Sequence, residues 1–449
     1  MDKPNFLKRL LGSVSRPAGA LTASEARKAR QVVARCRALL SERGEASGAS
    51  LARETLTDYH ALADASLDAF FDMLDEEFSP DPTMVWRAAE DYRNDPSQQH
   101  LIQLQKVVEA PRQELFRRLN LASGGTGTLV QMRRRILLGL KKNPQWASTE
   151  SDLGHLLSSW FNRGFLTLQR IDWRTSAIVL EKLIQYEAVH QIQGWDDLRR
   201  RLQADRRCYA FFHPALPDEP VIFIEVALTH GMSAMVQPLL DPASPISDPG
   251  RADCAIFYSI TNCQEGLRGI SFGNFLIKQV ADDLGREFPK VKTFATLSPI
   301  PGFRKWLAGD VAKHASEVQG RQIAMLLERM DDPQWFADKG LCAALQKPLT
   351  ALCAHYLLHA KHRDEPLDAV ARFHLSNGAR LDRINWLGDI SEAGMVRSAG
   401  LMVNYVYKLA DVEQNHEAYV KEHRVIASSR LEALAKDALP AQSRRGGTK

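Results

Sequence analysis

Thr293-Phe-Ala-Thr-Leu-Ser-Pro-Ile-Pro-Gly-Phe303 is an apolar, extended stretch in which a serine precedes two closely spaced prolines. A proline disfavours helical geometry in the residue before it, so Pro299 keeps Ser298 in an extended conformation. The stretch therefore predicts a strand over residues 293–298 with Ser298 at its end. Ligands of α/β proteins bind where strands end, so Ser298 is a candidate functional residue.

A second rigid motif, Arg372-Phe-His-Leu-Ser-Asn-Gly-Ala379, follows later in the chain. Asn-Gly between two apolar runs is the strongest short-range signal for a β-hairpin. We therefore expect residues 370–375 and 380–386 to pair across Asn377-Gly378, with His374 near a strand end. Histidine titrates near neutral pH and suits proton transfer. Taken alone, His374 is also compatible with a structural role, and so is Ser298.

The surrounding sequence alternates between strand and helix patterns. Further strands are expected at 208–212, 221–228 and 254–261. A helix is expected over 272–288, where apolar residues recur every fourth position. Residues 307–365 return to helical patterns, and a last helix, which contains Tyr407, is expected over 391–410. The C-terminal part is therefore predicted to be a mixed α/β domain with a helical insertion, which makes the chain an α+β protein.

The first 190 residues carry amphipathic helical patterns and few strand signals. Thr22-Ala-Ser-Glu25 matches a capping box in front of a helix over 26–40. Ser123-Gly-Gly-Thr-Gly-Thr128 lacks the Lys-Ser/Thr pair and the preceding strand of a phosphate loop, so it is interpreted as a helix connector. A helical bundle of this kind usually serves packing or oligomerisation. The predicted domains are 1–190, 191–435 and a disordered tail over 436–449.

The composition is ordinary for globular proteins, with 45% apolar and 25% charged residues among 449. No uninterrupted apolar stretch of about 18 residues occurs, which argues against a membrane span. A net charge of +4 is too small to indicate a nucleic acid partner. The six cysteines include no Cys-x-x-Cys pair and are expected to be reduced thiols. The N-terminus lacks a secretory h-region but is basic and amphipathic, so a bacterial cytoplasm and a mitochondrial matrix both stay open.

Arg268-Gly-Ile-Ser-Phe-Gly-Asn274 lies between an expected strand and an expected helix, where glycines let backbone N–H groups approach a pyrophosphate. The segment resembles the loop with which the acyl-CoA N-acetyltransferase superfamily holds coenzyme A (CoA), although Ser271 stands where the first glycine usually is. A plain helix-entry turn is one alternative. The letters also fit the Gly-x-Ser-x-Gly elbow of α/β-hydrolases, but that elbow needs a strand running straight into its serine, and the polar segment 263–268 intervenes.

Three blocks of sequence together resemble the malonyl-CoA decarboxylase family. The resemblance is strong over about residues 206–409 and general in the helical N-terminal half. The blocks are Phe257-Tyr-Ser-Ile with Gln264-x-Gly-Leu-x-Gly269 and Gly273-x-Phe-Leu-Ile-Lys278; Arg286-Glu-Phe-Pro289 with Leu297-Ser-Pro-Ile-Pro-Gly-Phe303; and Phe373-His-Leu-x-Asn-Gly-Ala379 with Arg383-Ile-Asn-Trp386 and Gly400-Leu-Met-x-Asn-Tyr-x-Tyr407.

The resemblance implies a helical domain for self-association, as a dimer or tetramer, and a catalytic domain with an acetyltransferase-type fold. It implies conversion of malonyl-CoA to acetyl-CoA and carbon dioxide, with neither biotin nor a metal ion. The family's catalytic serine and histidine fall on Ser298 and His374, and a functional tyrosine falls on Tyr407. Its CoA contacts fall on Arg268, Gly269, Ile270, Ser271, Phe272, Gly273 and Asn274. Relatives carry an acidic residue at the position of Ser271, so no role of that acid transfers to this chain.

Loss of carbon dioxide from a malonyl thioester leaves an enolate, with charge on the thioester oxygen and the α-carbon. The site then needs a donor for the oxyanion, a group that holds the carboxylate, and an acid for the carbon. Ser298 suits the first two tasks and His374 the third, while Ser298 as a base towards the carboxyl stays open. Two other functions also stay open, namely a CoA-dependent N-acyltransferase with an amine acceptor and a non-catalytic CoA sensor or scaffold.

Overall fold

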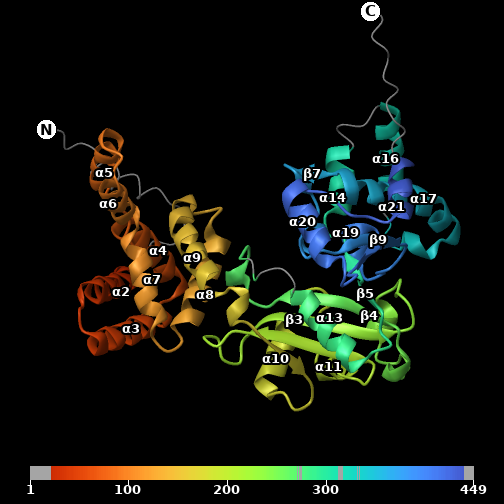
Figure 1. The fold of residues 1–449 in the computed structure, drawn as a ribbon, viewed down its shortest axis with the longest axis horizontal. Coiled ribbons are helices and arrows are strands. Elements are labelled where there is room, and N and C mark those ends of the chain that lie inside the picture. The colour runs from red at the N-terminus through yellow and green to blue at the C-terminus, as the bar shows by residue number, and fades with distance from the viewer. Residues whose placement is uncertain are drawn as a thin grey trace, which may run out of the picture. The chain divides into compact units, whose positions relative to one another are not determined.

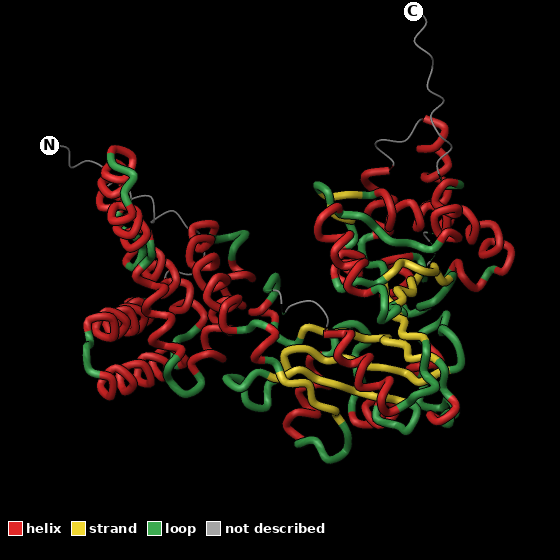
Figure 2. Tube along the Cα trace, viewed as in Figure 1, coloured by secondary structure: helices red, strands yellow, loops and turns green. Residues whose placement is uncertain are grey.

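The described residues form two compact units, coloured by chain position in Figure 1 and by secondary structure in Figure 2. The first unit consists of the chain up to Asn162 together with Gln264–Ile270, and the second of Arg163–Cys263 and the chain after Ile270. Helices build the first unit, and a mixed sheet with helices builds the second, which confirms the predicted α+β class. The computed structural model describes residues 22–270, 272, 276–311, 317–330, 332 and 334–438.

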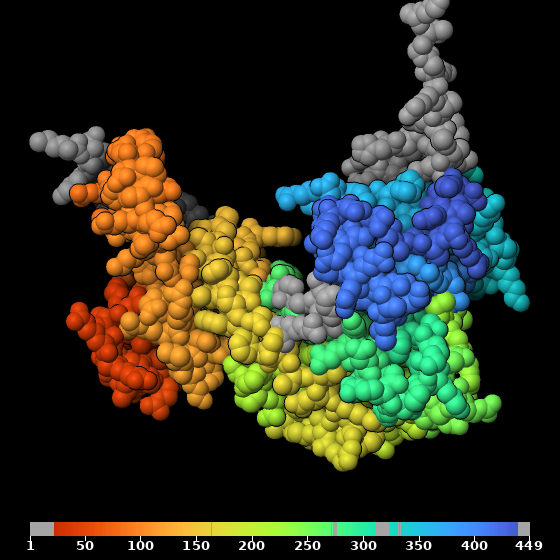
Figure 3. All heavy atoms as spheres, in the orientation of Figure 1, coloured from red at the N-terminus to blue at the C-terminus, as the bar shows by residue number. Residues whose placement is uncertain are grey.

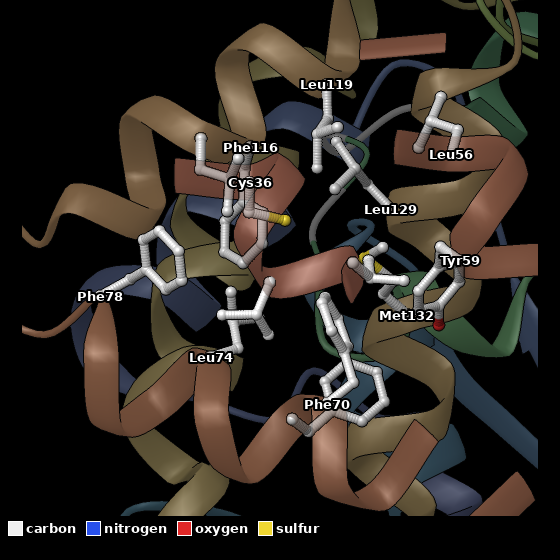
Figure 4. Packing of buried hydrophobic residues seen from close by; sticks show 14 of the residues in the cluster. Cys36, Leu56, Tyr59, Phe70, Leu74, Phe78, Phe116, Leu119, Leu129 and Met132 are labelled. Carbon is white, nitrogen blue, oxygen red and sulfur yellow. The ribbon is translucent and has the colours of Figure 1, made fainter. Parts of the chain in front are cut away.

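The helical unit is a bundle around one apolar core. Its helices are α2 (Ala23–Ser41), α3 (Glu45–His60), α4 (Asp64–Glu77), α5 (Pro82–Asn94), α6 (Gln98–Val108), α7 (Pro111–Asn120), α8 (Gly125–Gly139) and α9 (Ala147–Trp160). Phe70, Phe116 and Leu129 meet in the core from α4, α7 and α8 (Figure 4). The expected capping box at Thr22 and Glu25 is confirmed. Residues 123 and 124 of the glycine-rich segment belong to the connection from α7 to α8, as predicted, and residues 125–128 form the first turn of α8.

The second unit is built on an eight-stranded sheet in the order β1-β2-β3-β4-β5-β10-β6, with β9 paired to β10. Its strands are β1 (Thr167–Ile171), β2 (Arg206–Phe212), β3 (Pro220–Thr229), β4 (Cys254–Asn262), β5 (Thr293–Thr296), β6 (Ser298–Pro299), β9 (Arg380–Asn385) and β10 (Met402–Val406). β4 and β5 are parallel, and the other pairs are antiparallel. The strands expected at 208–212, 221–228 and 254–261 are confirmed, whereas β1 lies in the region expected to be helical.

Helices connect and surround these strands. They are α10 (Ala177–Tyr186), α11 (Trp195–Arg201), α12 (Gln237–Leu240), α13 (Leu276–Glu287), α14 (Phe303–Trp306), α16 (Glu317–Arg329), α17 (Lys339–His359), α18 (Ala369–Ser376), α19 (Glu392–Ser398), α20 (Val412–Glu422) and α21 (Ser429–Lys436). A short hairpin, β7 (Lys361–His362) with β8 (Glu365–Pro366), follows α17. α13 is the crossover that the parallel pair β4–β5 requires. The predicted helical insertion is confirmed by α14, α16 and α17, which lie between β6 and β9 in the chain.

The expected hairpin around Asn377-Gly378 is wrong, because residues 369–376 form helix α18. Asp368 caps the start of this helix by accepting from the Val370 and Ala371 N–H groups at 3.0 and 2.9 Å. At its end, Gly378 N donates to Leu375 O and Ala379 N to His374 O, the two bonds of a Schellman motif. Gly378 has a φ of +80°, which this motif favours. Asn-Gly therefore stops a helix here.

The expected helix over 391–410 is also wrong. Helix α19 ends at Ser398, where Ala399 and Gly400 have φ values of +52° and +74°. The chain then enters strand β10, and Tyr407 follows the last residue of that strand. Tyr407 N donates to Phe294 O at 2.8 Å, which extends the pairing of β10 with β5. Tyr407 therefore lies at the end of a strand rather than on a helix.

Residues 1–21 and 439–449 lie outside the described part of the chain. Most of the expected C-terminal tail over 436–449 belongs to this group, and so does the basic N-terminus. Among the helices that the structure describes, none is both long enough and apolar enough to cross a membrane.

Candidate active site

Ser298 lies in β6, at one edge of the sheet. It pairs with Val403 of β10, and Pro299 pairs with Met402. An edge strand tolerates proline, because the missing N–H costs no ladder bond on the open side. Thr296, two residues earlier, ends β5 and is fully buried. The predicted strand over 293–298 is thus divided between β5 and β6, and Ser298 is buried although it lies in an edge strand.

Asp368 ties the turn after Ser298 to the helix that carries His374. Besides capping α18, its buried carboxylate accepts from the Gly302 N–H and, at 3.4 Å, from the Tyr356 hydroxyl of α17. Burial raises the pKa of Asp368, and the backbone N–H donors partly oppose that rise. One side chain therefore joins two segments that are far apart in the sequence.

Ser298, His374 and Tyr407 meet in a single line of hydrogen bonds. Ser298 Oγ lies 3.0 Å from His374 Nε2, and the Tyr407 hydroxyl lies 2.8 Å from His374 Nδ1. Ser298 Oγ donates to Thr296 Oγ1 at 2.8 Å. Tyr405 stacks on the imidazole with 4.5 Å between ring centroids. We call the line Tyr407–His374–Ser298–Thr296 the relay.

The hydrogen-bond pattern assigns the protons of the relay. A serine hydroxyl has one proton; when Ser298 donates it in the hydrogen bond to Thr296, Ser298 accepts from the Nε2–H tautomer of His374. Nδ1 of the neutral ring is then an acceptor, and the Tyr407 O–H donates to it. Every donor in the relay therefore points from Tyr407 towards Thr296. In this state His374 is not a base for Ser298.

Burial sets the ionisation of the relay. His374 is only 3% exposed, and desolvation lowers its pKa from the ordinary 6.5 to about 3. Desolvation raises the pKa of Tyr407 well above its ordinary value. The expectation that His374 titrates near neutral pH is therefore wrong. At neutral pH the relay consists of a neutral imidazole and a neutral phenol.

The low pKa of His374 predicts a pH-dependent stability. Below pH 6.5 the unfolded chain protonates this imidazole, whereas the folded chain keeps it neutral down to about pH 3. Folding stability is therefore lost as the pH falls through this window, by about 1.4 kcal/mol per pH unit from this residue. In denaturant unfolding, the wild type should lose about 2 kcal/mol more than His374→Asn between pH 7 and pH 5. Equal losses in the two proteins would contradict the assignment.

Only part of the candidate CoA segment is described. Arg268, Gly269 and Ile270 belong to the helical unit, and Phe272 is buried in the second unit. Ser271, Gly273 and Asn274 lie outside the described residues. Gly269 has a φ of +81°, and both Arg268 and Gly269 are exposed. The structure thus brings Ser298, His374 and Tyr407 together and describes the start of the CoA segment separately.

Sequence reasoning missed Thr296, Tyr405 and Asp368. Thr296 had a signal, because residues two apart in a strand face the same side, so Thr296 and Ser298 share a face. Asp368 also had one, because an aspartate in front of an apolar run is an N-cap signal. Tyr405 had a weaker signal, since it shares the face of Tyr407 only once residues 402–407 are recognised as extended. Among the described residues, no group of three or more His, Cys, Asp or Glu side chains would suit a metal ion.

Comparisons with known proteins agree across most of the chain. Residues 78–161 match the family model of the malonyl-CoA decarboxylase N-terminal domain, and residues 164–445 match that of the C-terminal domain. The mitochondrial malonyl-CoA decarboxylase of Anser anser anser is 38% identical over 341 residues, which is 71% of this chain and 68% of that protein.

Solved structures give the same result. The malonyl-CoA decarboxylase of Rhodopseudomonas palustris is 50% identical, with a TM-score of 0.87, and the match covers 90% of this chain and 99% of that one. The enzyme of Agrobacterium vitis is 47% identical, with a TM-score of 0.83 and the same coverage. Two family models that together span more than half of the sequence, and relatives of this identity, confirm the resemblance found in the motifs. The chain therefore belongs to the malonyl-CoA decarboxylase family, a family of carboxy-lyases.

Proposed function

We propose that the relay is the centre at which this chain decarboxylates malonyl-CoA to acetyl-CoA and carbon dioxide. The observation that carries the proposal is the contact of Ser298 with His374, because a serine and a histidine 76 residues apart meet at 3.0 Å in a buried position. Tyr407 completes the arrangement from the end of β10. All three residues are those on which the family's functional residues fall.

The first step breaks the bond between the α-carbon and the carboxylate of the malonyl group. Its electron pair stays on the α-carbon and delocalises onto the thioester oxygen, and carbon dioxide leaves. Ser298 serves this step by turning its hydroxyl from Thr296 towards the developing oxyanion. Only the hydroxyl proton has to rotate, because the Ser298 oxygen is already held by Thr296 and His374, and a fixed donor in a water-excluded site stabilises such charge strongly.

The second step delivers a proton to the α-carbon. An enolate carbon is a far stronger base than an imidazole nitrogen, so neutral His374 can give up its Nε2 proton, either directly or through Ser298. Tyr407 then supplies its hydroxyl proton to Nδ1, and the ring returns to a neutral state. The transfer leaves a Tyr407 phenolate and a ring with its proton on Nδ1, so the starting arrangement returns when one solvent proton reaches Nε2 and the Nδ1 proton goes back to the Tyr407 oxygen. The ring therefore stays neutral before and after the transfer, in keeping with its lowered pKa.

The segment from Arg268 to Asn274 is the proposed contact for CoA. Its described part supports this role. Arg268 is exposed, and Gly269, which has a positive φ and no side chain, leaves the neighbouring peptide group accessible to a ligand. In the proposed reaction, malonyl-CoA is the substrate, and neither biotin nor a metal ion takes part.

Malonyl-CoA supplied alone tests the proposed function against the N-acyltransferase alternative. A decarboxylase releases carbon dioxide and acetyl-CoA without any acceptor. A transferase needs an amine and releases free CoA. Chromatography of the CoA species, with carbon dioxide followed in parallel, separates these results. Release of free CoA that requires an amine, without acetyl-CoA or carbon dioxide, would overturn the proposal, and tight CoA binding without turnover would favour a sensor.

We further propose that the helical unit mediates self-association through the hairpin of α5 and α6. This hairpin stands off from the rest of its unit (Figures 1 and 3). Ala88 is the only buried residue of α5, and α6 has none among its described residues. Trp86 is 76% exposed and Ile102 62% exposed, an arrangement that favours a second copy of the chain as the cover.

A charge on this hairpin should reduce the oligomer to a smaller species. We expect the double substitution Trp86→Glu and Ile102→Glu to lower the mass measured by sedimentation or light scattering, because two charges would be desolvated in the interface. Leu138→Glu on α8 is the matched control, since that leucine is 64% exposed in the same unit. An unchanged mass in the double variant, or an equal loss in the control, would contradict the role of the hairpin.

A further inference from the structure

Residues Gln264–Ile270 follow β4 and Cys263 in the chain but belong to the helical unit. Their short 3₁₀ turn, Glu265–Leu267, contacts helix α8. The contact is close at Gly266, where a Cβ atom would lie 1.9 Å from the Val130 carbonyl oxygen. Leu267 and Ile270 are buried. The segment is therefore packed against α8 through a position that only glycine fits.

Arg133 of α8 holds the backbone of this segment. Arg133 is buried, with 6% of the residue exposed. Its Nη1 donates to Gly266 O at 2.7 Å and to Arg268 O at 3.0 Å. The other edge of the guanidinium faces Glu150, where Nε and Nη2 donate to Oε1 at 3.0 and 2.7 Å. Glu150 balances the charge, so the remaining donors of Arg133 act on main-chain carbonyls of residues 266 and 268. We call this arrangement the Arg133 clasp.

The clasp fixes the direction of one peptide group. In a trans peptide the C=O and the following N–H point in opposite directions, and no described peptide is cis. Because Arg268 O faces Arg133, the Gly269 N–H points away from α8. The side chain of Arg268 and the backbone of Gly269 are exposed. The clasp thus presents a backbone N–H beside a guanidinium, the donor types that phosphate oxygens bind.

We propose that Arg133 is a positioning residue for recognition of the phosphate groups of CoA. It acts from the helical unit by holding the Arg268–Gly269 peptide, and it does not touch the reacting atoms. The inference rests on the proposed CoA role of the segment that begins at Arg268. The helical unit then contributes to substrate affinity in addition to any role in self-association.

Substrates with and without the nucleotide test the inference. Wild type, Arg133→Met and Arg133→Lys are titrated calorimetrically with CoA and with pantetheine, and turnover of malonyl-CoA and malonyl-pantetheine is compared. We expect Arg133→Met to weaken CoA binding about tenfold or more, because charge-assisted bonds that hold the peptide are lost. Pantetheine binding and kcat should stay within about twofold, and Arg133→Lys should recover part of the affinity. Titration with 3′-dephospho-CoA then assigns the effect to the pyrophosphate, if it persists, or to the 3′-phosphate, if it disappears.

Arg112→Met is the matched control, because Arg112 is also a buried arginine of the helical unit and bonds Asp152 and Ser79 instead. Equal losses for CoA and pantetheine, or a control that loses CoA affinity as Arg133→Met does, would overturn the inference. Should Arg133→Met fail to fold, Gly266→Ala displaces the segment from α8 without removing an ion pair, and the same selective loss is expected. The binding measurements do not depend on turnover. A wild type that binds CoA but does not decarboxylate malonyl-CoA would therefore contradict the proposed reaction, while the titrations would still test the role of Arg133.

Discussion

Replacing His374 by Asn is expected to reduce kcat for malonyl-CoA by between about a hundred- and ten-thousandfold, the range that a positioned acid contributes. The asparagine cannot pass a proton between Tyr407 and Ser298, because its amide lacks the two ring nitrogens with which an imidazole accepts a proton on one side and donates one on the other. Binding of CoA should change little, since His374 is buried beside the sheet and is not part of the CoA segment. Steady-state kinetics and calorimetry measure the two quantities separately.

His190→Asn is the control for this experiment. His190 is also buried in the second unit, and burial likewise lowers its pKa, to about 4, so its loss imitates the structural cost of removing a buried imidazole. We expect the control to keep its turnover per folded molecule. If His374→Asn retained a kcat within tenfold of the wild type, the carbon acid would be a different group and the relay would have a structural role.

Tyr407→Phe examines the other end of the relay. It keeps the ring that packs at the end of β10 and removes only the hydroxyl that donates to Nδ1. If Tyr407 resupplies the proton, this variant should lose much of the same rate, and the losses in the double variant with His374→Asn should fall well short of the product of the single losses. Independent, multiplying losses would separate Tyr407 from His374.

The sequence predicted those elements whose geometry is determined locally. Pro299 and Pro301 restrict their neighbours whatever the rest of the chain does, so the extended conformation around Ser298 followed from the residues alone. The strongly apolar strands β2, β3 and β4 were equally clear, because a run such as Val221–Leu228 has Glu225 as its one charged residue and lacks the polar face of a surface helix. The capping box at Thr22 is a contact over three residues and was also predictable.

The errors near His374 and Tyr407 have one cause: the same residues suit two structures. Asn-Gly adopts positive φ both in a hairpin turn and at the end of a helix, and the Asp368 cap together with the Schellman bonds decided for the helix. Residues 401–406 are apolar enough for either element, and pairing of β10 with β5, β6 and β9 decided for the strand. Such tertiary pairing overrides local propensity. The pKa of His374 was likewise inaccessible, because burial is a property of the folded chain.

The candidate site was predictable as residues but not as an arrangement. Family motifs pointed to Ser298, His374 and Tyr407, but neither spacing nor composition indicated that the Ser298 hydroxyl donates a hydrogen bond to Thr296. That contact matters for the mechanism, since it directs every proton of the relay from Tyr407 towards Thr296. A serine nucleophile activated by histidine needs the reverse direction, in which Ser298 donates to Nε2. The direction inferred from these contacts therefore favours Ser298 as a hydrogen-bond donor to substrate.

Ser298→Ala tests this role and is expected to lower kcat by about a hundred- to a thousandfold, the usual effect of removing one donor to an oxyanion. KM should change little, because the donor acts on charge that develops only in the transition state. Ser376→Ala is the matched control, since Ser376, a half-buried residue, lies on the same helix as His374 and its hydroxyl donates to Phe373 O at 3.0 Å. We expect the control to retain wild-type kinetics.

The same experiment separates a donor from a nucleophile. If Ser298 only donates, mass spectrometry of the wild type mixed with malonyl-CoA should find the protein unmodified, and so should mass spectrometry of His374→Asn, in which any acyl intermediate would accumulate. An acyl group on Ser298 would mean that the proton of its hydroxyl leaves before the substrate reacts, and the direction assigned from the Thr296 contact would then be wrong. A Ser298→Ala variant with undiminished kcat would remove Ser298 from the reaction altogether, because the alanine methyl can neither donate to an oxyanion nor hold a carboxylate.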